Sequence, residues 1–289
     1  LGAPDFDETV AAPPNATGPE GTMTSDPPST AMLFRGPRPD CAGLRSLRFP
    51  PLPGSLEEAE AVAELWRSYH EPASMPAPVR LLTGPAATET AVKRQAPGNR
   101  LLHIATHGYF LNGTCPSGFG GTRGIGLLVS DENAAEEDRS VREVENPLLL
   151  SGLVLAGGNR REATAPDQDD GILTAQEIAA LDLSGVDWAV LSACETGVGE
   201  VLNGEGVLGL RRAFRVAGTR TLITSLWSVR DEETRRWMDA FYRGRLEGKR
   251  ETIDALREAD LTMLDERRRR GASTHPFYWG AFIASGDWR

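Results

Sequence analysis

Short apolar segments alternate along the chain with segments whose apolar residues recur every three or four positions. The first pattern is typical of buried strands and the second of helices with one apolar face. The predicted strands are residues 79–84, 100–106, 125–129 and 276–285, a strand or strand pair at 148–158, and apolar runs before Cys194 and before residues 226–230. The predicted helices are residues 55–69, 87–96, 174–181, 231–248 and 251–270, with another after Gly204. This alternation predicts an α/β sandwich around a mainly parallel central sheet.

Some of the predicted helices begin with side chains that can satisfy the free backbone N–H groups of a first turn. Ser55 with Glu58, and Thr174 with Glu177, fit the capping-box pattern, in which the two side chains bond each other's backbone. Thr88 is placed to cap the helix predicted next to it. These residues fix where we expect the helices to begin.

Residues 1–53 are rich in Pro, Gly, Ser and Thr. Such a composition buries too little apolar surface to offset the entropy of ordering, so we expect a strand remnant at 1–3 and then a Pro-rich flexible segment. The folded domain is then residues 54–289. The opening LGAPDFD, without an initiator methionine, indicates a fragment cut within or just after a first strand. Residues 108–147 are interpreted as a long insertion, which in compact domains is usually functional or disordered.

Charge and cysteine content narrow the class of protein. The net charge of −10 argues against nucleic-acid binding, which normally needs a basic face. The run Arg267 to Arg270 is interpreted as a solvated helix end, where cations are favourable. No apolar run approaches the roughly 18 residues of a membrane span, so no membrane contact is expected. The three cysteines form no disulfide or zinc spacing, which favours a reducing cytoplasm.

The candidate chemistry centres on Cys194, which follows the apolar run in VDWAVLSAC. His107 follows another apolar run, LLHIATH, and precedes Gly108. If the two strands are neighbours, about 4.8 Å apart, both side chains face one crevice at their carboxyl ends. The imidazole can then assist formation of the thiolate, and the N–H groups of Gly108 and Cys194 can bind an oxyanion. From position alone, a buried structural cysteine and a satisfied histidine stay the alternative.

Two other residues compete for these roles. His103 would share one strand face with His107, and we interpret it as a core residue beneath His107 that supports it. A metal pair of the two histidines is weaker, because no carboxylate or thiolate lies at ligand spacing. Cys115, in the sequence GTCPSG, is a weaker nucleophile because a mobile loop cannot hold a fixed geometry. No metal is expected.

The glycines after Cys194 mimic a dinucleotide fingerprint, since Gly204, Gly206 and Gly209 spell GxGxxG. In that fingerprint the glycines come directly off a strand, whereas here ten residues separate Cys194 from Gly204. Loop mobility and close helix packing explain them better. No cofactor is expected.

The ordered motifs HIATHG, SACETG and SLWSVRDEET resemble a CHAT domain, a caspase-like family often fused to TPR repeats and related to separases. LGAPDFD, LPGSLEEAEAVAELW, LLTGPAATE and PFYWGAFIASGD extend the resemblance over nearly the whole chain. It implies a caspase-like three-layer sandwich and a cysteine endopeptidase, with His107 as catalytic histidine and Cys194 as nucleophile. The Pro-rich segment and the insertion at 108–147 depart from the family pattern. These departures concern how the implied peptidase is activated more than the His107–Cys194 dyad.

The turn before the helix at 231–248 bears on substrate choice. Asp231 most simply caps that helix. In separases a similar Trp-Val-Asp turn bears on recognition of a basic residue, so the resemblance implies a pocket that contains Asp231 and prefers Arg or Lys. Glu195 is assigned either to substrate binding or to accepting backbone N–H groups in its loop.

The resemblance also implies the setting in which the domain works. We expect a protein substrate, gating by an upstream TPR-like region or a regulatory partner, and a cytoplasmic role in bacterial signalling or defence. The alternative is a catalytically silent interaction module with the same fold.

Overall fold

The computed structural model describes residues 1–9, 44, 47–70, 78–111, 114–115, 142–143, 147–165, 168–192, 205–227 and 229–287. Cys194, Glu195, Gly204 and the strand predicted at 125–129 lie outside these residues. Asp231 is described by its backbone only.

The central sheet is mixed, with strand order β11-β10-β9-β3. Its strands are β3 (Leu101–Ile104), β9 (Trp188–Leu191), β10 (Thr221–Ser225) and β11 (Phe282–Gly286). The strands β3, β9 and β10 are parallel, as the alternation of strands and helices predicts, and β11 is antiparallel to β10. A helix therefore connects β9 to β10, and two long helices lie between β10 and the antiparallel edge strand β11.

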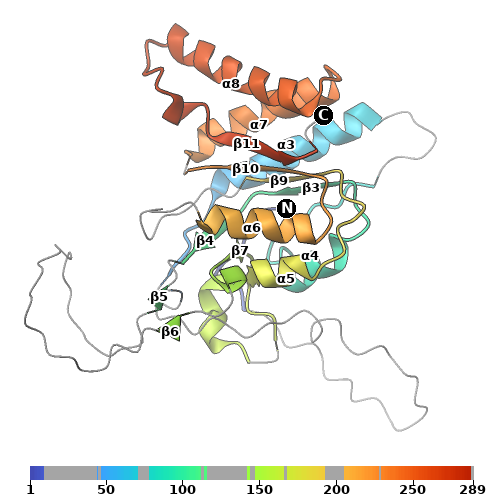
Figure 1. Ribbon diagram of the computed structural model, residues 1–289, viewed down its shortest axis with the longest axis vertical. Helices are drawn as coiled ribbons and strands as arrows, with labels where there is room; N and C mark the ends of the chain where they lie inside the picture. Colours follow the sequence, from blue (N-terminus) through green and yellow to red (C-terminus); the bar gives the residue numbers. More distant parts are fainter. Residues whose placement is uncertain are drawn as a thin grey trace, which may run out of the picture.

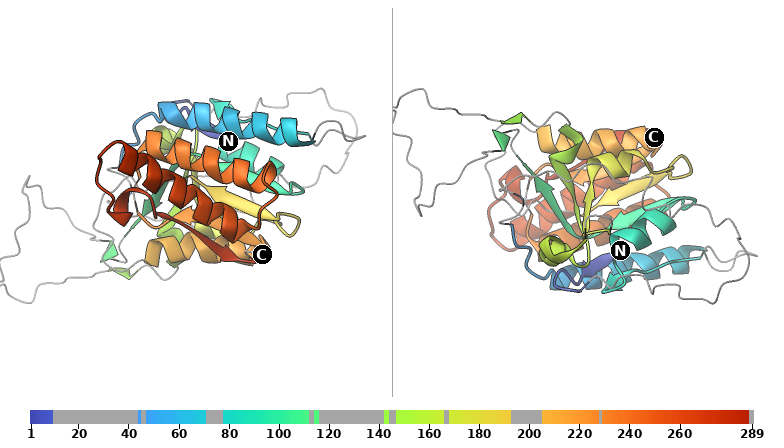
Figure 2. Two further views of the ribbon diagram at one scale, coloured as in Figure 1. Left: turned by 90° about the horizontal axis from the view of Figure 1, so that it is seen from above. Right: turned by 90° about the horizontal axis from the view of Figure 1, so that it is seen from below.

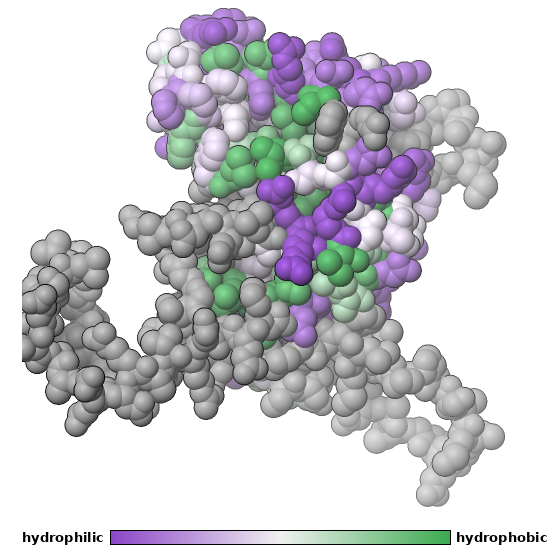
Figure 3. Space-filling model, viewed as in Figure 1, coloured by the Kyte–Doolittle hydropathy of each residue, from purple (hydrophilic) through white to green (hydrophobic). Residues whose placement is uncertain are grey.

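Helices cover both faces of this sheet (Figures 1 and 2). One face packs against α3 (Pro53–His70), α7 (Asp231–Leu246) and α8 (Thr252–Arg269), and the other against α4 (Glu89–Gln95), α5 (Ala175–Ala179) and α6 (Glu205–Val216). Trp237 from α7 stacks on Phe282 of β11 with ring centroids 4.2 Å apart. Such buried aromatic pairs add to the apolar burial that holds each layer. Hydrophilic side chains cover the outer side of α8 (Figure 3).

A short strand at the amino terminus continues the central sheet beyond β3. β1 (Gly2–Pro4) pairs in parallel with β2 (Thr83–Gly84), and Gly2 forms a parallel bridge with Ala105, just after β3. A Cβ atom at Gly2 would lie 2.3 Å from the carbonyl oxygen of Ser55. Only glycine permits this approach of β1 to α3.

A second sheet has the order β4-β7-β8 and is antiparallel. It contains β4 (His107–Phe110), β7 (Ser151–Val154) and β8 (Ile172–Thr174). The 3-10 helices η1 (Pro147–Leu149) and η2 (Gly158–Ala163) flank β7, and β5 (Thr114–Cys115) pairs with β6 (Arg142–Glu143) elsewhere. The chain thus passes from the central sheet to the second sheet between Ile104 and His107.

The predicted strands at 79–84, 100–106, 148–158 and 276–285 are all shorter than the pattern indicates. Within residues 79–84 only β2 forms a strand. Its partner β1 begins at Gly2, whose N–H donates to the Leu82 carbonyl, so β1 does not pair with the residues before Leu82. Residues 276–285 begin with the 3-10 helix η3 (Pro276–Tyr278), since Pro276 lacks the N–H that a strand ladder needs and the His275 side chain caps the turn. The stretch 148–158 is one strand, β7, that leaves through a turn at Gly157 with φ of 86°.

The predicted caps have different outcomes. Thr174 with Glu177 forms the capping box, and Thr88 caps α4. The capping box at Ser55 is wrong: α3 begins at Pro53, and the Ser55 hydroxyl instead donates to Leu52 and accepts from Ala3. Asp231 is the first residue of α7 rather than its cap, because the extended cap residue is Arg230.

One cluster of charged groups lies inside the protein beside α4. Lys93 contacts carboxylate oxygens of Glu89, Asp169 and Glu177 at 2.6, 3.0 and 3.0 Å. Burial and the Glu177 charge raise the pKa of Glu89 well above its ordinary value. Burial alone would lower the pKa of Lys93, but the Glu89 and Glu177 carboxylates outweigh it and raise that pKa. The cluster joins α4, the segment before β8, and α5.

Candidate functional site

The strands that lead to His107 and toward Cys194 are neighbours. β3 pairs in parallel with β9, with Ile104 opposite Leu191, and the backbone N–H of Ser192 donates to Ile104 at 3.0 Å. His107 comes three residues after Ile104, and Cys194 comes three residues after Leu191. Both strands therefore end at the same edge of the sheet, which is where parallel α/β sheets place their functional groups.

His107 is fixed by a backbone carbonyl as well as by its own strand. Its side chain is 1% exposed, and it begins β4 opposite Val154. The ring nitrogen Nε2 lies 2.7 Å from the carbonyl oxygen of Pro50. Because a carbonyl oxygen only accepts, Nε2 carries the hydrogen in this bond. In the neutral ring Nδ1 is then the nitrogen able to accept a proton.

Two aromatic rings, which are also neighbours of each other, contact the His107 imidazole. The centroid of the Phe6 ring lies 5.0 Å from that of His107, and the Phe49 ring centroid lies 5.7 Å from it. Both phenylalanines belong to a buried cluster with Val154 and Ile172. Phe6 and Phe49, which lie near opposite ends of the Pro-rich segment in the sequence, thus both contact this histidine.

Two side chains of η2 secure the segment that carries Pro50. Asn159 accepts a hydrogen bond from the Phe49 backbone N–H at 2.9 Å and donates to its carbonyl at 3.0 Å. The Arg161 guanidinium donates to the carbonyls of Leu44 and Leu47. Sequence reasoning missed Pro50, Phe49, Asn159 and Arg161 in the site, because no local motif connects them with His107.

Gly108 follows His107 in β4, opposite Leu153, and is buried. Thr106, on the other side of His107, bonds the Val154 carbonyl through its hydroxyl. The backbone on either side of His107 is therefore held by β7. The oxyanion role of Gly108 and Cys194 stays a prediction.

His103 belongs to a different environment from His107. Its Nε2 atom lies 2.9 Å from a Glu58 carboxylate oxygen, and its Nδ1 atom lies 2.9 Å from the Tyr242 hydroxyl. The prediction of one shared strand face is wrong, because β3 ends at Ile104 and His107 begins a strand of the other sheet. His103 therefore links β3 to α3 and α7.

The other candidate residues are placed by their backbone. β10 lies beside β9 in parallel, with Thr224 opposite Leu191, so the turn that leads to Asp231 leaves the sheet at the same edge. Cys115 lies in β5 opposite Arg142, in a separate two-stranded sheet. Glu195 lies outside the described residues. The substrate-binding roles of Asp231 and Glu195 stay predictions.

The glycine pattern fits close packing of α6. A Cβ atom at Gly209 would lie 2.5 Å from the Ser151 hydroxyl of β7. The helix begins at Glu205, well after β9 ends at Leu191. The separation between strand and helix is thus longer than a dinucleotide fingerprint requires.

The described residues also bear on metal binding and membrane insertion. Within them, no group of three or more His, Cys, Asp or Glu side chains is arranged to hold a metal ion. Among the helices in the same ranges, none is both long and apolar enough to cross a membrane.

The mixed sheet with helices on both faces, and the strand-end histidine next to the strand that leads to Cys194, define an α/β protein of the CHAT-domain class. The family model "CHAT domain" matches residues 1–287, and the chain belongs to that family. Tetratricopeptide repeat protein 28 of Homo sapiens is 25% identical over 264 residues, which cover 90% of this chain and 9% of that protein. The Mus musculus protein of the same name is 25% identical over 82% of this chain and 9% of its own length. The chain thus spans about a tenth of the curated relatives it matches.

Proposed function

We propose that this domain is a caspase-like cysteine endopeptidase that cleaves a specific protein substrate with a dyad of His107 and Cys194. The observation that carries the proposal is the parallel pairing of β3 with β9, which ends both lead-in strands at one sheet edge. The fixed imidazole of His107 adds support. The fold that we propose is the three-layer sandwich of caspases, with its sheet between two helical layers.

The proposed reaction begins with proton transfer from the Cys194 thiol to Nδ1 of His107. The Nε2 bond to Pro50 keeps the ring in the tautomer that can accept this proton. The thiolate attacks the peptide carbonyl, and the N–H groups of Gly108 and Cys194 stabilise the oxyanion. His107 then gives its proton to the leaving amine, and water hydrolyses the acyl-enzyme.

We assign substrate preference to the turn that leads to Asp231, because β10 ends at the same edge as β9. A carboxylate there favours Arg or Lys before the cleaved bond, and Glu195 is proposed to line the same site. A peptide library screened with the activated full-length protein tests the preference. Equal cleavage after acidic and basic residues would show that Asp231 and Glu195 do not determine the substrate preference.

We also propose that an upstream TPR-like region or a regulatory partner gates the activity in the cytoplasm. The support is that both curated relatives are named as tetratricopeptide repeat proteins and are much longer than this domain. We expect the isolated domain to cleave its protein substrate more slowly than the full-length protein does. Equal rates would contradict gating.

An electrophilic peptide probe tests the dyad directly. Labelling should be lost in Cys194→Ala and kept in Cys115→Ala, which serves as the matched control because it removes a thiol from a different sheet. His107→Ala should also lose labelling. Labelling that survives Cys194→Ala would reject the proposed nucleophile.

A catalytically silent interaction module is the second candidate. The burial of His107 against Phe6 and Phe49 favours it, because a satisfied core histidine has the same surroundings. This candidate predicts no labelling of Cys194 by any peptide probe, with or without the upstream region present. It also predicts that His107→Ala affects the stability of the fold and no catalytic property.

A further inference from the structure

A cavity of about 270 Å³ lies at the edge of the central sheet opposite to the edge that leads to His107. The parallel strands β3, β9 and β10 begin at this edge, and the antiparallel strand β11 ends beside them. The end of α7 and the start of α8 also line it. Three arginines and two aspartates line this arginine cavity, together with one tryptophan and two threonines. A ligand that fits the cavity is therefore polar or charged.

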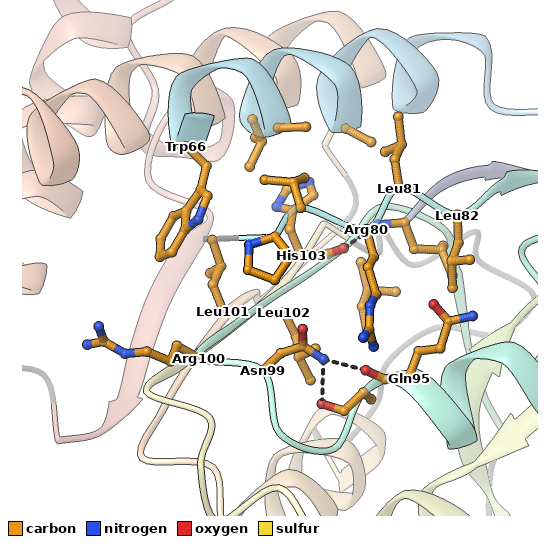
Figure 4. A pocket seen from close by; sticks show the side chains of 18 of the residues that line it. Trp66, Arg80, Leu81, Leu82, Gln95, Asn99, Arg100, Leu101, Leu102 and His103 are labelled. Carbon is orange, nitrogen blue, oxygen red and sulfur yellow. Dashed lines mark hydrogen bonds between the residues drawn. The ribbon is translucent and has the colours of Figure 1, made fainter. Parts of the chain in front are cut away.

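On the strand side of the cavity, two arginines share one carboxylate. Nη2 of Arg100 lies 2.8 Å from Oδ2 of Asp187, and Nη1 of Arg220 lies 3.3 Å from Oδ1 of the same residue. The Asp287 carboxylate is farther away, with Oδ2 3.8 Å from Nη2 of Arg220. Figure 4 shows the Arg100 side chain extending away from Asn99. The two arginine side chains are 76% and 61% exposed, so both can reach a bound anion.

On the helix side, the third arginine forms no ion pair with a carboxylate in the described ranges of the chain. The guanidinium carbon of Arg245 lies 4.5 Å from the centroid of the Trp188 ring. Its Nε atom donates to the Thr252 hydroxyl at 3.2 Å, and its Nη1 atom donates to the Arg250 carbonyl at 2.5 Å. Burial lowers the pKa of Arg245, although the charge of Glu251 opposes that effect. The positive charge of this arginine is thus held in place and only partly compensated.

The start of α8 brings further hydrogen-bond donors to the arginine cavity. Thr252 is the first residue of the helix and is 1% exposed. Its hydroxyl oxygen accepts from Arg245, so the hydroxyl hydrogen can be donated to another acceptor. The cap residue, Glu251, makes no side-chain hydrogen bond to the first turn. The N–H groups of such a helix start are favourable partners for an anion.

The donors approach the arginine cavity from two directions, which bears on the shape of the ligand. Guanidinium groups bind the oxygens of carboxylates and phosphates through paired hydrogen bonds. A carboxylate has two oxygens in one plane, whereas the oxygens of a phosphate point in several directions and can contact the strand side and the helix side together. Three arginines against two aspartates leave one positive charge in the lining, in a chain whose net charge is −10. The cavity therefore suits a compact phosphate group.

We propose that the arginine cavity binds a phosphate-bearing small molecule. Arg100 and Arg220 contact the phosphate from the strand side, and Arg245 with the start of α8 contacts it from the helix side. The bound group then links α7 and α8 to the first residues of β9 and β10. The site is separate from the proposed peptidase dyad, because it lies at the other edge of the sheet from His107.

Titration calorimetry of the 289-residue chain with sodium pyrophosphate, at an ionic strength held constant with NaCl, tests the proposal. We expect one saturable site and a thermal midpoint that rises with pyrophosphate concentration, since the ligand binds the folded state alone. Arg245→Met keeps an apolar stem over Trp188 and should weaken binding at least about tenfold, because it removes charge-assisted hydrogen bonds. Arg243→Met is the matched control on the same helix: its partners are Asp239 and Glu247, outside the cavity, so binding should equal that of the wild type.

A second variant and a second measurement cover the case in which Arg245→Met does not fold. Arg220→Gln changes an exposed side chain on the strand side and should weaken pyrophosphate binding severalfold. Amide NMR shifts on binding should be large at Thr221 and Thr252 and small at Thr224, near the other end of β10. Neither measurement depends on peptidase activity.

Three outcomes would overturn the proposal. The first is the absence of saturable pyrophosphate binding to the wild type. The second is equal binding to the wild type, Arg245→Met and Arg220→Gln, which would locate the anion elsewhere. The third is a phosphoserine peptide that binds this cavity more tightly than pyrophosphate does, which would make a modified protein the source of the phosphate.

Discussion

The Nε2 atom of His107 donates to the carbonyl oxygen of Pro50 across 2.7 Å, although the two residues are 57 positions apart in the chain. The bond selects the tautomer of the imidazole and fixes the plane of its ring. Asn159 holds the neighbouring Phe49 backbone by two hydrogen bonds, so the position of the carbonyl depends on η2 as well. His107 is thus oriented by three separate parts of the chain.

Asn159→Ala should slow the labelling of Cys194 by a peptide probe about tenfold, because small displacements of a positioned base have large effects on rate. The variant loses the two bonds to Phe49, which we expect to cost about 1–3 kcal/mol of unfolding free energy. A change in the pH dependence of labelling should accompany the loss, since the tautomer is less strictly held. Rate against pH and urea denaturation are the measurements.

Asn99→Ala is the matched control for that variant. Asn99 also bonds backbone carbonyls, those of Gln95 and Ala96 at the end of α4, but it lies away from His107. It should lose comparable stability and keep the labelling rate. Equal loss of labelling in both variants would show that Asn159 acts only through stability.

His103→Leu should destabilise the fold without removing the proposed chemistry. It leaves the Glu58 carboxylate, which is 2% exposed, without the ring nitrogen 2.9 Å away, and leaving a buried polar group without its partner typically costs about 1–3 kcal/mol. The folded fraction should still label at Cys194, in contrast to His107→Ala. Adding Glu58→Gln to His103→Leu should recover part of the stability. Loss of labelling in the folded His103→Leu protein would indicate that His103 takes part in the proposed chemistry.

The strand ends were predictable from the sequence because apolar runs are local patterns, whereas the pairing of the two strands was only a condition of the prediction, since it joins distant segments of the chain. Ile104 pairs opposite Leu191, so His107 and Cys194 each follow paired strands by the same number of residues. The Pro50 carbonyl was not predictable, because a backbone atom in a Pro-rich segment has no sequence signature. The error over His103 arose because an even spacing predicts a shared face only while the strand continues.

The strand at 79–84 shows the same difference between pattern and pairing. Its apolar residues predict a buried strand, but a strand needs a partner along its whole length. β1 supplies one only at Thr83 and Gly84. The capping box at Ser55 failed because α3 begins at Pro53, and the Glu58 carboxylate lies 2.9 Å from Nε2 of His103 rather than at the helix start.

Lys93→Met should lower the unfolding free energy by about 3–5 kcal/mol at neutral pH, because it leaves the buried carboxylates of Glu89, Asp169 and Glu177 without their cation. The loss should be smaller near pH 5 than at pH 8, since burial raises the pKa of Glu89 and protonation removes the charge of that carboxylate. Arg100→Met is the control: its side chain is 76% exposed and 2.8 Å from Asp187, so about 1 kcal/mol or less is expected. Similar losses for both in urea denaturation would contradict the cluster's role.

Asp260→Asn should flatten the dependence of stability on pH. Burial raises the pKa of Asp260 to about 6, although Trp237 Nε1 donates to its Oδ1 atom at 2.8 Å. Because the folded-state pKa is above the unfolded value of about 3.9, the folded state holds the proton more strongly between pH 4 and pH 6. The Asp260 contribution therefore falls as pH rises through that window and is constant above it.

The asparagine keeps an oxygen acceptor for Trp237 and has no carboxyl proton to lose. Thermal midpoints of the wild type and Asp260→Asn should therefore diverge in favour of the variant from pH 4 to pH 7, and then remain a constant distance apart. Asp260→Leu is the matched control, because it removes the charge and also the acceptor. It should be less stable than Asp260→Asn by about 1–3 kcal/mol at every pH, since the Trp237 N–H is then buried without a partner. Parallel pH profiles for the wild type and Asp260→Asn would refute the assignment of this titration to Asp260.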